Sequence, residues 1–481
     1  MRRFNAKHSE FMDVKPQQND ESKNSQGLQA QLDSRHIQLI AIGGAIGTGL
    51  FMGSGKTIAL SGSSILLTYM IIGFFLFFLM RALGELLLSN SKYNSFADFA
   101  SEYLGHWTGF FIGWSYWLSW VIACIGDVVI VGGYIQFWFP NLPIWIPAFS
   151  CLFGLVFLNM LSVKLFGELE FWFAIIKIIA ILALIATGCW MVITGYVSPS
   201  GVHASVHHLF NGDVFFPHGA SGFLAGFQIA IFSFIGIELV GVTAKEAKNP
   251  EKTLPKAINS IPLRILFFYV LSIACIIMVS SWYQISATQS PFVQLFTLAG
   301  LPAAAAVINF VVLTSALSSA NSGVFSTSRM VFGLAHKKSA PRPLKKLSNS
   351  NIPMRGLVLS GACMVMGALL LFLVPSVMTL FTLLSTLAAI LLLFIWTIIL
   401  LSYLVYRKKR PELHQASVYK MPLGRFMSYA CLTFFAFILI ILWFKEDTRI
   451  GLMIAPVWFI WLIFAYRYRE KINQLVSKFY V

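Results

Sequence analysis

The sequence predicts an all-α protein whose chain crosses a membrane many times. Of its 481 residues, 57% are hydrophobic and 11% are charged, whereas soluble domains carry about 25% charged residues. Apolar runs of about 20 residues, the length that a helix needs to cross a bilayer, recur along nearly the whole chain. These runs are continuous rather than alternating, which excludes a transmembrane β-barrel.

Twelve apolar runs predict twelve transmembrane helices. The third run contains no break and is long enough to cross the bilayer at a strong tilt. The predicted spans are residues 37–57, 64–88, 107–137, 144–163, 171–194, 222–243, 263–281, 302–328, 357–374, 378–405, 427–444 and 452–468.

The spans are expected to form one membrane domain with a polar segment at each end. Residues 1–32 are polar and are predicted to be a disordered cytoplasmic segment. Residues 33–468 form the membrane domain, because no polar insert within them is long enough to fold alone. Residues 469–481 form a cytoplasmic C-terminal tail. The first 35 residues lack the apolar core of a secretion signal, so no cleaved leader is expected.

The basic residues predict the orientation of the chain. With the N-terminus in the cytoplasm, 30 of the 35 lysines and arginines fall on the cytoplasmic side, and only Lys56, Lys445 and Arg449 fall on the other side. Positive residues are retained on the cytoplasmic side of membrane proteins. Both termini are therefore predicted to be cytoplasmic, and the net charge of +16 reflects topology rather than a nucleic-acid partner.

Glycines interrupt two of the predicted spans. The stretch "AIGGAIGTGLFMG" (41–53) carries five glycines, each of which destabilises a helix interior by about 1 kcal/mol relative to alanine. Gly236 and Gly241 interrupt the sixth span in "FSFIGIELVG" (232–241). Interrupted helices at corresponding positions of two halves indicate the binding site of a secondary transporter. Because five spans separate the two breaks, the second half is expected to be inverted relative to the first.

The two breaks predict a site for a zwitterion. Amides at a broken helix end attract a carboxylate, and freed carbonyls accept hydrogen bonds from an ammonium group. The candidate amides belong to Gly47, Thr48 and Gly49, and the candidate carbonyls belong to Phe232, Ser233 and Ile235. The alternative for the first break is a GxxxG packing face formed by Gly43 and Gly47.

Ionisable residues within the predicted spans are candidate coupling or gating groups, because a charge inside a bilayer must be paired or solvated. Lys177 either carries a proton or replaces a bound cation, or it extends to the cytoplasmic interface. Glu238 either gates the site or joins helices, and Asp127 either lines a cavity or pairs helices. Arg81 and Glu85 lie four residues apart and are expected to pair with each other.

Small hydroxyl side chains line the eighth span, "LTSALSSANSGVFSTSRM" (313–330). Such residues permit close helix packing and interhelical hydrogen bonds. Alternatively, Ser318 and Ser319 contribute to a proton or cation site shared with the first span.

The sequence contains no signature of catalysis or of ATP-driven transport. It has no P-loop, nucleotide fingerprint or nucleophile elbow. The six cysteines lie in apolar spans without CxxC pairing, and the histidines lack metal-site spacing. We therefore expect no catalytic residue, no metal site and no cofactor.

Three stretches resemble the bacterial amino acid permeases of the amino acid–polyamine–organocation superfamily, and the resemblance covers about residues 32–470. They are "RHIQLIAIGGAIGTGLFMGSGKTI", "FSFIGIELVGVTAKEAKNPEKTLPKAI" and "INFVVLTSALSSANSGVFSTSRMVFGLA". The resemblance implies a leucine-transporter-type five-plus-five inverted repeat with two additional C-terminal helices, located in the bacterial cytoplasmic (inner) membrane. It also implies import of a small neutral amino acid by alternating access, with glycine, D-alanine and D-serine as the expected substrates.

The same resemblance assigns further roles. It implies that the substrate carboxylate lies at residues 46–49 and the amine at residues 232–236. These two ranges add Ile46, Phe234 and Gly236 to the candidate substrate-binding residues. Lys177 matches a lysine that occupies the sodium-site region of sodium-driven relatives, which implies proton symport. Many relatives that carry larger amino acids have glutamate where this chain has Asp127. The alternatives are an exchanger or facilitator on the same scaffold and, from another class, an amino acid receptor.

Overall fold

The computed structural model describes residues 46–90, 93, 95–210, 215–239, 249–374 and 376–479. Within these residues the regular structure is helical, and the one strand-like feature is an isolated bridge between Val197 and His203. The main helices are α2 (Ser54–Ser61), α3 (Ile65–Ser89), α4 (Phe96–Leu104), α5 (His106–Ile135), α6 (Trp145–Leu161), α7 (Val163–Ile193), α10 (Gly219–Ala230), α12 (Pro250–Asn259), α14 (Ser272–Ser280), α15 (Pro291–Leu298), α16 (Pro302–His336), α17 (Met354–Ala368), α18 (Val377–Lys409), α19 (Pro411–Ala416), α20 (Gly424–Trp443) and α21 (Glu446–Phe479).

The predicted multi-pass, all-α class is confirmed. In the part of the chain that the structure describes, nine helices are long and apolar enough to cross a membrane, and two shorter apolar helices, Trp145–Leu161 and Gly219–Phe234, accompany them. Each predicted span coincides with a helix where it is described. The first span continues beyond its predicted end at residue 57, through α2 to Ser61, and a turn at Gly62 with φ +58° then leads into α3. The total of twelve spans stays a prediction.

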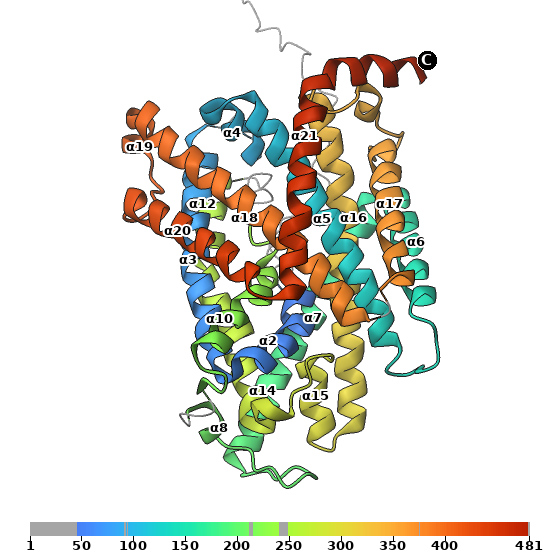
Figure 1. The fold of residues 1–481 in the computed structure, drawn as a ribbon, viewed down its shortest axis with the longest axis vertical. Coiled ribbons are helices and arrows are strands. Elements are labelled where there is room, and N and C mark those ends of the chain that lie inside the picture. The colour runs from blue at the N-terminus through green and yellow to red at the C-terminus, as the bar shows by residue number, and fades with distance from the viewer. Residues whose placement is uncertain are drawn as a thin grey trace, which may run out of the picture. The chain divides into compact units, whose positions relative to one another are not determined.

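Helix α5 forms the centre of the helical packing. It packs against α4, α6, α16, α17 and α18, and Figure 1 shows it lying along α16 and α17. Its 30 residues contain no proline, so the backbone ladder continues through the interior without a break. Because the middle of α5 is buried, Asp127 is held inside the protein rather than at a surface.

Within the described residues, the chain departs from regular α-helix in both predicted segments. Residues 46 and 47 form a bend, and a π-helical turn, η2 (Gly49–Gly53), precedes α2. In the sixth span, α10 narrows into a 3₁₀ turn, η4 (Ile231–Phe234), after which Ile235 leaves the helix with ψ 136° and Gly236 adopts φ +91°. Gly43, Gly44 and Gly241 lie outside the described residues, as does the polar segment 1–32.

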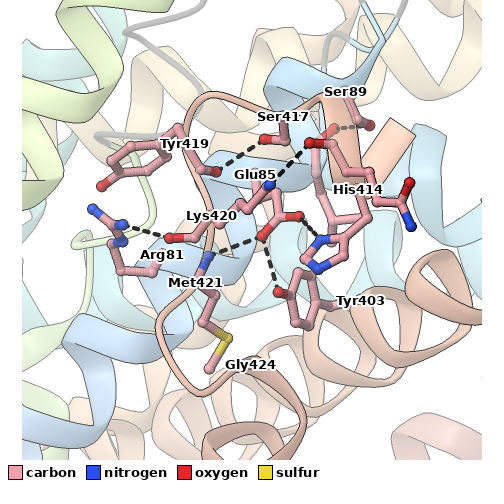
Figure 2. A network of polar contacts seen from close by, with 12 residues as sticks. Arg81, Glu85, Ser89, Tyr403, His414, Ser417, Tyr419, Lys420, Met421 and Gly424 are labelled. Atoms are coloured by element: carbon pink, nitrogen blue, oxygen red, sulfur yellow. Dashed lines mark hydrogen bonds and ion pairs between the residues drawn. The ribbon is translucent and has the colours of Figure 1, made fainter. Parts of the chain in front are cut away.

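Arg81 and Glu85 do not pair with each other, contrary to the expectation from their spacing. The fully buried Glu85 carboxylate accepts hydrogen bonds from the Tyr403 hydroxyl (2.9 Å) and the Met421 amide (2.9 Å), and it lies 2.5 Å from His414 Nδ1 (Figure 2). These partners come from α18 and the segment after it, which are more than 300 residues away in the chain. Helical spacing alone contains no information about such distant partners.

Candidate substrate and coupling site

The two interrupted segments touch at Gly49 and Ser233. A Cβ atom on Gly49 would lie 2.5 Å from Ser233 Cα and 2.9 Å from the Ser233 amide nitrogen. Carbon atoms in contact are about 3.5–4.0 Å apart, and the two obstructing atoms belong to the backbone and cannot rotate away. Only glycine at position 49 permits this crossing, which explains one glycine of the cluster.

Gly47 does not make a comparably close contact. A Cβ atom on Gly47 would have Ser319 Oγ as its nearest neighbour, at 3.9 Å, which is an ordinary contact. The structure therefore provides no support at Gly47 for the GxxxG packing alternative, whose other member, Gly43, is not described. It does place Ser319, a predicted coupling residue, beside the first segment.

Thr48 and Asp127 connect the first segment to α5. The Thr48 hydroxyl donates a hydrogen bond of 2.5 Å to Asp127 Oδ1. Asp127 is 1% exposed, and its second oxygen, Oδ2, has no hydrogen-bond partner among the described residues. Asp127 thus joins the first segment to α5 through Oδ1, and the Ser319 hydroxyl also faces its carboxylate.

Lys177 points inward toward the first segment. Its ammonium nitrogen lies 3.2 Å from the backbone carbonyl oxygen of Ile46, and the residue is 1% exposed. This position contradicts the alternative in which Lys177 extends to the membrane interface. The Ser315 hydroxyl donates to the same Ile46 carbonyl at 3.3 Å. Ile46 was expected to contact the substrate. Its carbonyl accepts hydrogen bonds from Lys177 of α7 and Ser315 of α16.

Ser318 bonds to Glu170 of α7, and its part in a proton or cation site stays a prediction. Its hydroxyl donates to Glu170 Oε2 at 2.7 Å, and Asn321 Nδ2 donates to Glu170 Oε1 at 2.9 Å. Sequence reasoning missed Glu170 because it precedes the predicted start of the fifth span. The signal was its position seven residues before Lys177, which puts both side chains on one face of α7.

The carbonyls of the sixth segment are partly occupied. Phe232 O accepts from the Ile235 amide at 3.0 Å, and Ser233 O accepts from the Tyr269 hydroxyl at 2.7 Å. A carbonyl has two lone pairs, so Ser233 O retains capacity for one further donor. Ile235 is the residue that leaves the helix, so its carbonyl is no longer directed toward a following helical amide. Of the three predicted acceptors, Ile235 is the most accessible to an ammonium group.

Phe232 and Phe234 point to different neighbours. The Phe232 ring packs edge-on against Phe381 and lies beside Gly49, at the crossing of the two segments. The Phe234 ring stacks on Tyr269 with centroids 5.0 Å apart. Phe232 is therefore the aromatic side chain that limits space at the crossing, whereas Phe234 packs within the helical core.

Glu238 lies two residues after the sixth-segment break and is fully buried. Neither of its carboxylate oxygens has a hydrogen-bond partner in the described structure, and the same holds for Tyr116 Oη, Trp120 Nε1 and Trp396 Nε1. Tyr116 and Trp396 face the Glu238 carboxylate. Because Tyr116 and Trp396 come from α5 and α18, they place the Glu238 carboxylate between helices, and its gating role stays a prediction.

The described residues contain no group of three or more histidine, cysteine, aspartate or glutamate side chains arranged to hold a metal ion. The arrangement does present backbone amides, the Asp127 carboxylate and the Ile235 carbonyl around the crossing of Gly49 and Ser233. Such a set can bind a small molecule that carries both a positive and a negative group.

Comparison with known proteins gives matches over nearly the whole chain. A family model described as amino acid permease matches residues 36–475. The D-serine/D-alanine/glycine transporter of Escherichia coli O6:H1 is 58% identical over 447 residues, which cover 93% of this chain and 95% of that protein. The transporter of the same name in Escherichia coli K12 is 57% identical with the same coverage. The amino-acid permease AapA of Bacillus subtilis is 49% identical over 94% of this chain and 97% of its own length.

Proposed function

The chain belongs to the amino acid permease family, and we propose that it imports small neutral amino acids, with glycine, D-alanine and D-serine as substrates. Family membership makes it a transporter and not an enzyme. The observation that carries the substrate proposal is the identity of 57–58%, over 93% of the chain, to two transporters named for these three amino acids.

The proposed architecture is twelve helices with a five-plus-five inverted repeat followed by α20 and α21. Two facts support it: the described parts of the first and sixth spans both depart from regular α-helix, and these two segments are in contact. Both termini are proposed to lie in the cytoplasm of a bacterial inner-membrane protein, which the distribution of lysine and arginine supports.

The substrate is proposed to bind at the crossing of the two segments. Its carboxylate approaches the amides of Thr48 and Gly49, where the first helix begins, and its ammonium group approaches the Ile235 carbonyl. The contact between Gly49 and Ser233 and the ring of Phe232 restrict the space for a side chain. A substrate with no more than a methyl or hydroxymethyl group suits this site better than a bulky one.

A proton is proposed as the coupling ion, with the proton gradient as the driving force and no further cofactor. When Lys177 is protonated, its ammonium group holds the Ile46 carbonyl. When it is neutral, the amine binds that carbonyl less strongly, because hydrogen bonds from charged donors are about twice as strong as those from neutral ones. Protonation thereby stabilises one position of the first segment, which also carries Thr48 and its bond to Asp127.

Uptake by proteoliposomes tests this proposal. Labelled glycine should accumulate under an inward proton gradient and should cease to accumulate when the gradient is collapsed. Unlabelled D-alanine and D-serine should compete, and phenylalanine should not. Exchange of internal for external glycine without net accumulation would instead identify an exchanger, and binding without any flux would identify a receptor.

A further inference from the structure

The 410–423 segment, which joins α18 to α20, is fixed to α3 by two side chains one turn apart. Glu85 holds it from within the protein. Arg81 donates to the backbone carbonyl of Lys420 and to Asn259 Oδ1 (3.0 Å), and its guanidinium carbon lies 3.9 Å from the centre of the Tyr419 ring (Figure 2). These contacts fix the positions of the charged side chains that the segment carries.

A cavity of about 390 Å³ lies beside this segment, and its charged lining is basic. Arg407 comes from the last turn of α18, His414 and Lys420 come from the 410–423 segment, and Arg425 comes from the first turn of α20. Among the described residues, no acidic side chain lines the cavity. The Glu85 carboxylate, which contacts His414, is also bonded to Tyr403 and Met421.

Three of these four basic side chains have no counter-ion in the described part of the chain, and the fourth, His414, contacts Glu85. None of the ion pairs found there includes Arg407, Lys420 or Arg425. Arg407 Nε is buried and has no hydrogen-bond partner in the same residues. Arginine and lysine bind phosphate through charge-assisted hydrogen bonds. The chemistry of the cavity therefore suits a phosphate group.

The position of the cavity indicates a phosphate that belongs to a lipid. Helices α18 and α20 are both long and apolar enough to cross a membrane, so the end of one and the beginning of the other lie at the depth of the headgroups. Leu423 and Phe426, which also line the cavity, are 71% and 70% exposed. Acyl chains would cover these side chains, whereas a soluble phosphate compound would leave them in water.

We propose that this cavity binds the phosphate of an anionic phospholipid, such as phosphatidylglycerol or cardiolipin. Basic pockets between transmembrane helices bind headgroups of this kind. The bound phosphate places a negative charge next to His414, whose ring also contacts Glu85. The lipid therefore adds a contact to His414, and because His414 contacts Glu85 of α3, this contact helps to hold the 410–423 segment against α3.

Lipid retention by the purified full-length protein tests the proposal. Delipidated protein in neutral detergent is titrated with phosphatidylglycerol, phosphatidylcholine or inorganic phosphate, and native mass spectrometry and thermal unfolding are recorded. Phosphatidylglycerol should be retained and should raise the melting temperature, and phosphatidylcholine should do neither. Because a hydrogen bond between charged groups contributes about 1.5–3 kcal/mol, Lys420→Gln or Arg425→Gln should weaken retention at least about 12-fold, and the double variant at least about 150-fold.

The matched control removes two cations from the same stretch that do not line the cavity, Lys408→Gln with Arg410→Gln. Its loss of phosphatidylglycerol binding should be at least about fivefold smaller than that of the cavity double variant, and Lys420→Arg should bind like the wild type. Equal losses in both double variants would overturn the proposal, because they would indicate non-specific surface attraction. Stabilisation by inorganic phosphate equal to that by the lipid would overturn the lipid assignment.

Discussion

Substitution of Gly49 by alanine tests whether transport depends on the close crossing of the two broken segments. The added Cβ atom would lie 2.5 Å from Ser233 Cα, and carbon atoms in contact need about 3.5 Å. The segments must therefore separate by about 1 Å. Overpacking of this kind typically destabilises a protein by about 1–3 kcal/mol. A displacement of about 1 Å in groups that position a substrate can reduce a rate by about 100-fold.

The assay is uptake of labelled glycine by proteoliposomes, together with thermal unfolding of the purified protein. Gly49→Ala should lower both the melting temperature and the initial uptake rate, the latter at least about tenfold. The matched control is Gly47→Ala, two residues earlier, where the added Cβ atom meets only Ser319 Oγ at 3.9 Å. Wild-type uptake and stability in Gly49→Ala, or equal losses in both variants, would refute the reasoning.

Three further substitutions test other contacts. Lys177→Met removes the donor to Ile46 and should abolish gradient-driven glycine accumulation while exchange continues; normal accumulation would exclude Lys177 from coupling. Thr48→Val leaves the buried Asp127 without its hydroxyl donor and should lower the free energy of unfolding by about 1.5–3 kcal/mol; an unchanged melting curve would count against the contact. Tyr403→Phe removes one of the donors to Glu85 and should cost about 1 kcal/mol in the same measurement, whereas unaltered stability would contradict that bond.

Hydropathy predicted the helices well because length and apolar composition determine membrane insertion. The third predicted span, 107–137, became α5 at His106–Ile135, and the tenth, 378–405, became α18 at Val377–Lys409. Glycine also correctly indicated the break in the sixth span, because Gly236 adopts a positive φ that other residues rarely accept. Apolar helices and a glycine break depend on residues that are close together in the chain, so both can be predicted from the sequence.

The contacts of individual side chains were less predictable, because they depend on segments that are distant in the chain. Spacing suggested that Arg81 pairs with Glu85, but the 410–423 segment supplies closer partners for both. The serine-rich eighth span offered several hydroxyls, and only the rotation of α16 decides that Ser318 bonds to Glu170 while Ser315 bonds to Ile46. Because the hydroxyl residues of α16 occupy more than one face of the helix, periodicity does not specify that rotation.

Equilibrium binding of substrate fragments to the purified transporter tests the central claim most directly. Glycine presents both charged ends to the two segments, whereas acetate lacks the ammonium group and methylamine lacks the carboxylate. Each charged hydrogen-bonding end contributes about 1.5–3 kcal/mol, so both fragments should bind at least about tenfold more weakly than glycine. Affinity of either fragment equal to that of glycine would contradict a site in which the first segment binds the carboxylate and the sixth binds the amine.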